Sequence, residues 1–217
     1  MSSHVWYASY GSNLSRDRFE RYLRGGTPVG GRRRYTGARD RTPPNDDQPL
    51  VLPCRLWFCG VSLTWGGGMA FIDTSRTGRT LGRMYLLSAE QFADVHAQEN
   101  GGDAKPADLV AMAPGQRVQA GGGNYPIVVC CGLADEVPIF TFTTDRPPRP
   151  TAPARAYMQT MACGLAESHD MSAGAIVNYL RAVPTVRDAY DMAALSAIAH
   201  AGVASAIVAP PRHSSPS

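Results

Sequence analysis

Hydrophobic and polar residues recur with two different periods, and the change of period divides the chain into an early strand-rich part and a late helical part. Short apolar runs between Gly, Pro and Asp residues predict strands at 5–10, 55–64, 69–73, 81–87, 125–132 and 137–143. Apolar residues three and four positions apart predict helices after the first strand, over 88–100 and in the last third. Because strands come mostly early and helices late, the order favours an α+β fold over a doubly wound parallel sheet.

Three helices are predicted in the last third of the chain. The first carries Tyr157, Met161 and Leu165 on one stripe. Ser172 is a typical N-cap and begins the second, and a third is expected over residues 185–200. No internal repeat relates these helices to one another or to the earlier strands.

The stretch WYASYGSNLS, residues 6–15, changes from strand to helix through a short polar turn. Such a change leaves the backbone N–H groups of residues 11–14 without partners in the helix, and together with the helix dipole they form an anion site. Gly11 lets a ligand approach the backbone, while Ser12 and Asn13 add donors and acceptors. An ordinary N-cap turn, which Ser and Asn also suit, explains the same residues equally well.

The best-defined helix of the sequence carries a glutamate on its apolar stripe. Ser88 and Gln91 form a capping box, which fixes the helical phase. Phe92 and Val95 define the buried stripe, and Glu99 continues it seven residues after Phe92. The simpler explanation is that Glu99 reaches water at the rim. The alternative is a carboxylate held in a pocket with a raised pKa, as a general base near neutral pH requires.

The histidines and cysteines show no metal or disulfide pattern. His96 lies three residues before Glu99 and could be its partner, although a surface or core histidine is the simpler interpretation. The five cysteines include no CxxC pair, so we predict reduced, buried thiols and neither a metal site nor a disulfide framework.

A long polar segment, residues 27–49, is rich in Gly, Pro, Arg, Asn and Asp, which predicts a loop with little to bury. Nine of the 21 basic residues lie between Arg16 and Arg41, although the net charge is only +3. A nucleic-acid patch would need a recognition motif or an aromatic ladder as well. Since neither accompanies the cluster, we favour a solvated loop and expect no nucleic-acid partner.

Length and composition are those of one soluble domain. The chain has 217 residues, 44% of them hydrophobic, which is enough for a core. A single domain is expected over 1–209, followed by a disordered tail at 210–217. No apolar run reaches the ~18 residues of a membrane span. The start of the chain has no signal-peptide pattern, so we expect a cytoplasmic protein that does not bind membranes.

Four blocks of the sequence resemble, in order, the gamma-glutamylcyclotransferase family. YASYGSNL (7–14) resembles the family's Tyr-Gly-Ser-Asn-Leu motif, and GGGMAFID (66–73) resembles its Gly-Gly-initiated strand. GRMYLLSAEQFADVHAQENG (82–101) resembles the strand and helix that end in the catalytic Gln-Glu. RPTAPARAYMQTMACGLAES (149–168) resembles the Pro-rich turn, pocket tyrosine and following helix.

This resemblance implies an α+β fold built on a small closed mixed β-barrel with flanking helices. It implies that Glu99 is the catalytic acid/base, that Tyr157 lines the pocket, and that the glutamyl moiety is held by Tyr10, Gly11, Ser12, Asn13 and Leu14. Phe140 stands where the family has a tyrosine, which implies that one polar pocket contact is absent.

The implied reaction is an intramolecular cyclisation. The α-amine of a γ-glutamyl amide attacks the γ-carbonyl, and Glu99 takes its proton and passes it to the departing amine. Backbone N–H groups of the turn stabilise the substrate carboxylate or the oxyanion. The products are 5-oxoproline and a free amine, and neither a metal nor an organic cofactor is required. A small γ-glutamyl amine is the implied partner, and the sequence leaves a homodimer open.

The amine half of the substrate is not identified by the sequence. The arginine-rich segment and the residues beyond 184 have no family counterpart, so an enzyme that removes a γ-glutamyl protecting group in a secondary-metabolite pathway stays open. A non-catalytic binding module of the same fold is a further alternative, and the retained Glu99 argues against it. Covalent catalysis is disfavoured, because Ser12 lacks a G-x-S-x-G frame and each cysteine lies in an apolar context.

Overall fold

Residues 4–102 and 112–208 are described by the computed structural model, and they form one mixed sheet, one separate hairpin and six α-helices. The sheet contains β1 His4–Ser9, β2 Asp46–Leu52, β5 Thr80–Ser88, β6 Arg117–Gln119, β7 Ile127–Ala134 and β8 Val137–Thr143. The hairpin consists of β3 Arg55–Cys59 and β4 Met69–Asp73. The helices are α1 Arg16–Arg24, α2 Ala89–Glu99, α3 Arg155–His169, α4 Ala173–Arg181, α5 Pro184–Arg187 and α6 Met192–Val208, and a 3₁₀ turn, Ser12–Leu14, precedes α1. The predicted α+β class is confirmed, whereas the predicted tail at 210–217 lies outside the described residues.

The strand order places β1 at the centre of the sheet. The order is β2-β5-β1-β8-β7-β6, in which β1 pairs antiparallel with β5 and parallel with β8. Val5 and Tyr7 pack into one apolar cluster, and Trp6 and Ala8 pack into another. Both faces of β1 are therefore buried, which explains why its sequence is apolar without alternation.

The sheet is open, so the predicted closed β-barrel is wrong. Its edges are β2 and β6, and within the described residues the β3–β4 hairpin pairs with neither of them. The hairpin is tied to the sheet by side chains instead, since Thr143 Oγ1 donates to the Ile72 carbonyl oxygen over 2.8 Å. A closed barrel needs backbone hydrogen bonds between its first and last strands. Pro49 in the edge strand β2 has no N–H to donate to such a bond.

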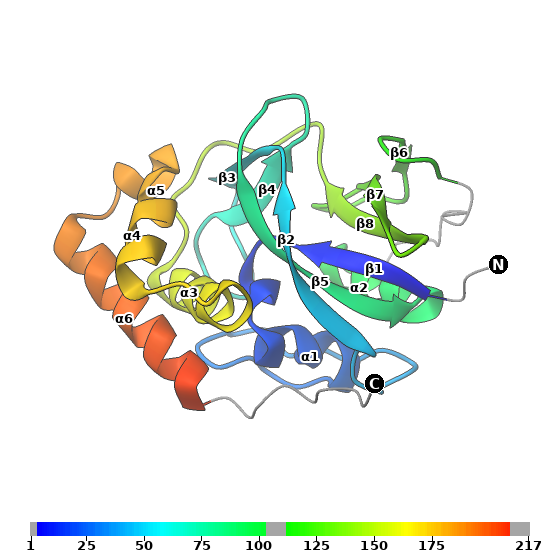
Figure 1. Ribbon diagram of the computed structural model, residues 1–217, viewed down its shortest axis with the longest axis horizontal. Helices are drawn as coiled ribbons and strands as arrows, with labels where there is room; N and C mark the ends of the chain where they lie inside the picture. Colours follow the sequence, from blue (N-terminus) through cyan, green and yellow to red (C-terminus); the bar gives the residue numbers. More distant parts are fainter. Residues whose placement is uncertain (1–3, 103–111, 209–217) are drawn as a thin grey trace.

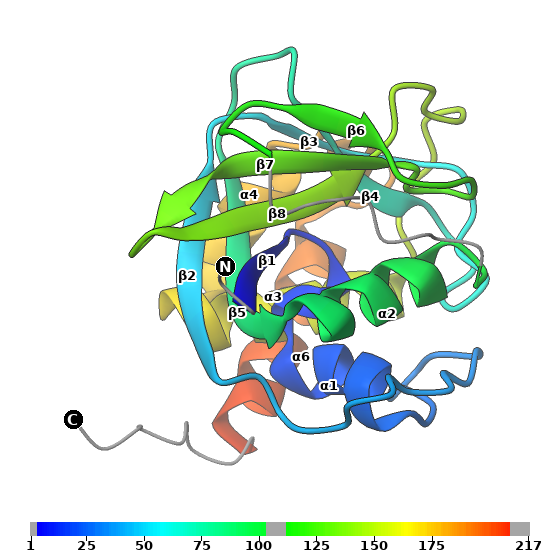
Figure 2. The same ribbon diagram turned by 90° about the vertical axis from the view of Figure 1, so that its right-hand side faces the viewer.

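The helices cover the sheet in two groups. Helices α3, α4, α5 and α6 gather on the left of Figure 1, while α1 and α2 lie next to each other in Figure 2. One large apolar cluster joins the first group to the early strands, and a second lies between α1, α2 and the sheet. The 3₁₀ turn after β1 contacts both α1 and α3, so it stands where the two groups meet.

The helix predicted over 185–200 is wrong in its extent, because α5 and α6 replace it. Asp191 Oδ1 accepts a hydrogen bond from the Ala194 N–H over 2.8 Å, as an N-cap does. Tyr190 lies in the break, and its hydroxyl donates to the Pro153 carbonyl oxygen over 2.8 Å. The break therefore anchors the start of α6 to the segment before α3.

The segment 27–49 is more buried than its composition predicts. Tyr35 and Ala38 are buried in the core, and Tyr35 pairs with Gly26 through reciprocal backbone hydrogen bonds of 2.9 and 3.0 Å. From Asp46 onward the segment is strand β2. The predicted loop is therefore confirmed for residues 27–45, whereas the expectation that it has little to bury is wrong at Tyr35 and Ala38.

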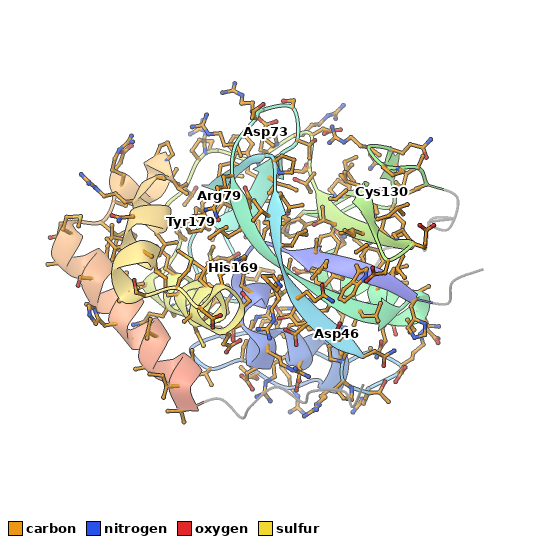
Figure 3. All side chains as sticks on the ribbon, in the orientation of Figure 1. Asp46, Asp73, Arg79, Cys130, His169 and Tyr179 are labelled. Carbon is orange, nitrogen blue, oxygen red and sulfur yellow. The ribbon has the colours of Figure 1, made fainter. Side chains whose placement is uncertain are left out.

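Strand β5 is held by side chains of the C-terminal helices, and Figure 3 labels two of them, His169 and Tyr179. Nε2 of His169 lies 2.7 Å from the Gly82 carbonyl oxygen, and the Tyr179 hydroxyl accepts the Leu81 N–H over 3.0 Å. Because β5 also has antiparallel neighbours on both edges, it is a fixed platform for the side chains that it carries.

Strands β7 and β8 are joined by a two-residue turn with an unfavourable backbone. Asp135 and Glu136 have φ values of 48° and 63°. Positive φ at both positions is that of a type I′ turn, which matches the twist of a hairpin. A side chain with a Cβ is disfavoured in this left-handed region by about 1–2 kcal/mol.

Replacing Glu136 by glycine should raise the free energy of unfolding by about 1 kcal/mol, because glycine adopts a positive φ without a steric penalty. Chemical denaturation measures the change. Glu136→Ala is the control, since it removes the same charge and keeps the Cβ. If alanine stabilises the protein as much as glycine does, the charge is responsible and the backbone explanation is wrong.

Candidate active site

The turn between β1 and α1 uses part of its own backbone internally. The Leu14 N–H donates to the Gly11 carbonyl oxygen over 3.0 Å, and the Ser12 N–H faces the Tyr157 hydroxyl. The Leu14 amide is therefore engaged within the turn, and the anion site at residues 11–14 stays a prediction. The carbonyl side of the turn is held as well, since the Tyr85 hydroxyl donates to the Asn13 carbonyl oxygen over 2.8 Å.

Glu99 comes to this turn from the end of α2. Ser88 and Gln91 make both hydrogen bonds of the predicted capping box, and the helical phase that they fix brings Glu99 to the inner side. Asn13 Nδ2 donates to Glu99 Oε1 over 3.2 Å and to the Tyr7 hydroxyl over 3.1 Å. The predicted meeting of Glu99 with the turn is confirmed, and the half-buried carboxylate is not a mere rim residue.

Two small cavities meet at Glu99. The first has a volume of about 30 Å³ and is lined by the turn and by aromatic side chains that include Tyr7, Tyr10, Tyr125, Phe142 and Tyr157. The second, of about 60 Å³, shares Ser12, Glu99, Tyr125 and Tyr157 with the first. Since a water molecule needs about 10–15 Å³ on this scale, each cavity has room for a few waters.

Tyr157 and Gly11 form a close contact at the first cavity. A Cβ placed on Gly11 would overlap the Tyr157 hydroxyl, so glycine is required there for space. The same hydroxyl accepts the Ala70 N–H over 3.4 Å. Burial raises the pKa of Tyr157 to about 12, and the hydroxyl therefore stays protonated at neutral pH.

The other predicted pocket residues divide into two groups. Tyr10 lines the first cavity, and its hydroxyl donates to the Phe142 carbonyl oxygen over 2.6 Å. The side chain of Leu14 lies in the apolar core and lines neither cavity, so the predicted contact of Leu14 with a ligand stays a prediction for its backbone. Phe140 also lies in the core, and it is Tyr125 that supplies a hydroxyl to the site by donating to the Ala70 carbonyl oxygen over 3.0 Å.

Arg18 is a functional candidate that the sequence did not reveal. Its side chain is only 3% exposed, and Nη2 donates to the hydroxyls of Tyr22 and Tyr35 over 3.0 and 2.8 Å. Nε and Nη1 are buried without a hydrogen-bond partner. Tyr22 also interacts electrostatically with Glu99, so the cation and the carboxylate share this phenol as a neighbour. The spacing of Arg18 and Tyr22, four residues apart on one helix face, is the only signal in the sequence.

The electrostatics of the site keep its tyrosines neutral. Burial is the largest cause that raises the pKa of Tyr7, Tyr10, Tyr22 and Tyr125, and the nearby charge of Glu99 raises it further. The described site thus combines one carboxylate, several protonated hydroxyls and one buried cation. Such a set can take up a proton, donate hydrogen bonds to an oxygen and bind an anion.

The remaining reactive side chains lie in unreactive surroundings. All five cysteines are free, and burial raises the pKa of Cys59 to about 11 and of Cys131 and Cys163 to about 12. Thiolate catalysis is therefore disfavoured, as the sequence predicts. Within residues 4–102 and 112–208, no group of three or more His, Cys, Asp or Glu is placed to hold a metal ion. No helix in that part of the chain has the length and apolarity to cross a bilayer.

Comparison with known sequences finds a relative but no family model. No family model matches the chain. The Arabidopsis thaliana protein named histone deacetylase 5 is 35% identical over 192 residues, which cover 77% of this chain and 29% of that protein. The chain thus spans less than a third of the relative's length, and the relative's name is not carried over to it.

Comparison with solved structures finds distant likenesses. A gamma-glutamyl cyclotransferase has a TM-score of 0.47 at 16% identity and covers 76% of this chain and 80% of its own. An uncharacterised protein from Homo sapiens has a TM-score of 0.48 at 16% identity, covering 77% of this chain and 81% of its own. YkqA from Bacillus subtilis has a TM-score of 0.46 at 17% identity, with 83% and 54% covered. Scores at this level carry no argument about function.

Gly11→Ala should lower the free energy of unfolding by about 1–3 kcal/mol, because the new methyl group displaces the buried Tyr157 hydroxyl. Tyr157→Phe removes the overlapping atom, so the double variant should recover part of the loss. Denaturation of the wild type, both single variants and the double variant gives the coupling energy. Strictly additive effects would show that the two residues do not compete for this space.

His96 should make the protein less stable as the pH falls below 6.5. Its Nε2 lies 2.8 Å from the Tyr125 carbonyl oxygen, and burial lowers the pKa of His96 from its ordinary value of 6.5, despite that hydrogen bond. Below pH 6.5 the unfolded chain binds a proton that folded His96 does not, so the free energy of unfolding decreases. His96→Gln should flatten this dependence below pH 6.5.

The exposed His200 offers the matched control for that experiment. Thermal or urea unfolding at several pH values should show an unchanged pH dependence for His200→Gln. An equal effect of both variants would mean that burial of His96 is not the cause.

Proposed function

We propose that this chain is a γ-glutamyl cyclotransferase, which releases 5-oxoproline and a free amine from a γ-glutamyl amide. The observation that supports this most is the contact of Glu99 with Asn13 of the turn, at a small cavity lined mainly by polar side chains. The Tyr-Gly-Ser-Asn turn and the Glu-ended helix are the two motifs whose resemblance suggested the reaction. They are far apart in the sequence, and an unrelated protein would have no reason to bring them together.

The α-amine of the substrate is the nucleophile in this reaction, and it needs a base beside it. Glu99 would take the proton from the attacking amine and return it to the departing amine. Asn13 Oδ1 is buried without a hydrogen-bond partner, so it can accept a hydrogen bond from the same amine. The site would hold the glutamyl group of the substrate folded so that its α-amine faces the γ-carbonyl. This proximity alone lowers the activation free energy by several kcal/mol.

The γ-carbonyl oxygen becomes negatively charged during the attack and needs donors. The Tyr157 hydroxyl accepts from the Ala70 N–H and faces the Ser12 N–H, which leaves its own hydrogen for the substrate. Because the pKa of Tyr157 is raised to about 12, the phenol donates this hydrogen bond in its neutral form. A donor of this kind typically contributes about 10²–10³-fold to the rate.

The two cavities must act together to hold a glutamyl group. Their volumes of about 30 and 60 Å³ suit a few waters each, whereas a glutamyl group is larger than either. Since both share Tyr125 and Tyr157, a small shift of one of these rings would join them. Substrate binding is therefore expected to displace ordered water and to move a tyrosine.

A panel of γ-glutamyl amines tests the proposed reaction. The protein is incubated with γ-glutamyl amino acids, γ-glutamyl alkylamines and γ-glutamylated polyamines, and 5-oxoproline is measured. Release from small amino-acid conjugates fits a general role, whereas release only from bulky amines fits removal of a protecting group in a biosynthetic pathway. If no conjugate yields 5-oxoproline, the proposed function is wrong.

Glu99→Gln should lower 5-oxoproline release by about 10⁴-fold, the upper end for acid–base groups, because one residue serves both proton transfers. The variant keeps the shape of the side chain and loses only the ability to exchange a proton. Because the capping box fixes α2, folding should survive. Rate and ligand affinity are measured together.

Glu90→Gln on the same helix is the matched control, since Glu90 is exposed and ion-paired to Arg39 at the surface. It should keep the wild-type rate. Near-full turnover by Glu99→Gln would remove Glu99 from the mechanism. Loss of binding together with rate would make it a recognition residue.

A further inference from the structure

Arg18 is a buried cation that forms no direct ion pair with any described residue. Its side chain is almost fully buried. A guanidinium stays charged in proteins, so burial cannot neutralise it. Folded chains leave such a charge unpaired only where another interaction or a ligand offsets the loss of hydration.

Aromatic rings around Arg18 offset that loss only in part. Its Cζ lies 4.6 Å from the ring centroid of Tyr22, 4.5 Å from that of Tyr35 and 5.9 Å from that of Trp65. These rings stabilise the cation through their π faces and hold it in place. Nε and Nη1 keep their unused N–H groups, and a ring face satisfies neither as a carboxylate oxygen would.

Arg18 also stands between two cavities. It lines the cavity of about 60 Å³ that contains Glu99, and it lines a larger cavity of about 440 Å³ on its other side. The larger cavity is bordered by Val29, Trp65 and Ala156, and by Val208 at the end of α6. A ligand that reacts at Glu99 would therefore pass beside the guanidinium, and any apolar extension would have space beyond it.

We propose that Arg18 is the carboxylate receptor of this site. The inference rests on the proposed function and specifies its substrate class: a γ-glutamyl compound that presents a free carboxylate to the unpaired guanidinium nitrogens. Two carboxylates of such compounds fit. The first is the α-carboxylate of the glutamyl group, whose neighbouring amine would then lie at Glu99. The second is the carboxylate of an amino-acid leaving group, whose side chain would extend into the larger cavity.

Binding of matched ligand pairs tests the inference. 5-Oxoproline is compared with 2-pyrrolidinone, which lacks the α-carboxylate. γ-Glutamyl-leucine is compared with γ-glutamyl-isopentylamine, which lacks only the carboxylate of the leaving group, in the Glu99→Gln background so that neither amide is consumed. Calorimetry measures each affinity for the protein with Arg18, for Arg18→Met, and for Arg24→Met as the control on the exposed face of the same helix.

Arg18→Met should weaken a ligand whose carboxylate Arg18 binds about 10–100-fold and leave 2-pyrrolidinone unchanged. γ-Glutamyl-isopentylamine keeps the α-carboxylate, so Arg18→Met should weaken it only if Arg18 binds that group. Weaker binding of 5-oxoproline assigns Arg18 to the α-carboxylate. Weaker binding of γ-glutamyl-leucine with unchanged 5-oxoproline assigns it to the leaving group. If the Arg18→Met variant folds and binds every ligand with the parent's affinity, the inference is wrong.

A measurement on the unmutated protein covers the case in which Arg18→Met does not fold. In the ¹⁵N NMR spectrum of the arginine Nε–H groups, 5-oxoproline or γ-glutamyl-leucine should shift one buried, exchange-protected resonance, and 2-pyrrolidinone should not. If neither 5-oxoproline nor γ-glutamyl-leucine shifts such a resonance, the inference is wrong. Failure of the proposed function is distinct, since it appears as absence of 5-oxoproline release while these binding comparisons still report on Arg18.

Discussion

The architecture of the site depends on Arg83, a buried arginine held between two carboxylates. Its guanidinium pairs with Asp47 of β2 and Glu167 of α3 at N–O distances of 2.6 and 2.7 Å, and all three side chains are nearly or largely buried. Nη1 also donates to the Leu14 carbonyl oxygen over 3.1 Å. One side chain thus joins two strands, the C-terminal helices and the turn that carries Asn13. Removing one member of such a group leaves an uncompensated buried charge, which typically costs about 3–5 kcal/mol.

The chain contains a second buried arginine, and its surroundings are the opposite. Arg83 has two carboxylates and a carbonyl oxygen, whereas Arg18 has two phenol oxygens and ring faces. Each nitrogen of the Arg83 guanidinium has a partner, so its role is structural. Arg18 is only partly paired, and its side chain lines a cavity that also contains Glu99, so it is a candidate for ligand binding. Stability is therefore built around Arg83, whereas the proposed chemistry uses Glu99 and Arg18.

Local signals in the sequence located the catalytic candidate well. The capping box of Ser88 and Gln91 fixes the phase of α2 within a few residues, so Glu99 could be placed on the apolar stripe. Whether it faces a pocket or water at the rim was decided only by the fold. Features that depend on contacts between distant segments could not be predicted from such local signals. Closure of a barrel depends on which distant strands pair, and Tyr35 is buried by α1 although its neighbours in the sequence are all typical of a loop.

The same distinction explains why the carboxylate was readable and its neighbouring cation was not. Glu99 interrupts an apolar stripe, so its helix alone marks it as unusual. Arg18 belongs to the charged helix RDRFERYLR, in which any arginine fits the expected solvent-facing pattern. It becomes exceptional only when Tyr35 and Trp65, from segments far along the chain, close over it. A buried charge of this kind is created by the tertiary fold, and its role has to be derived from its unused hydrogen-bond donors rather than from any local pattern.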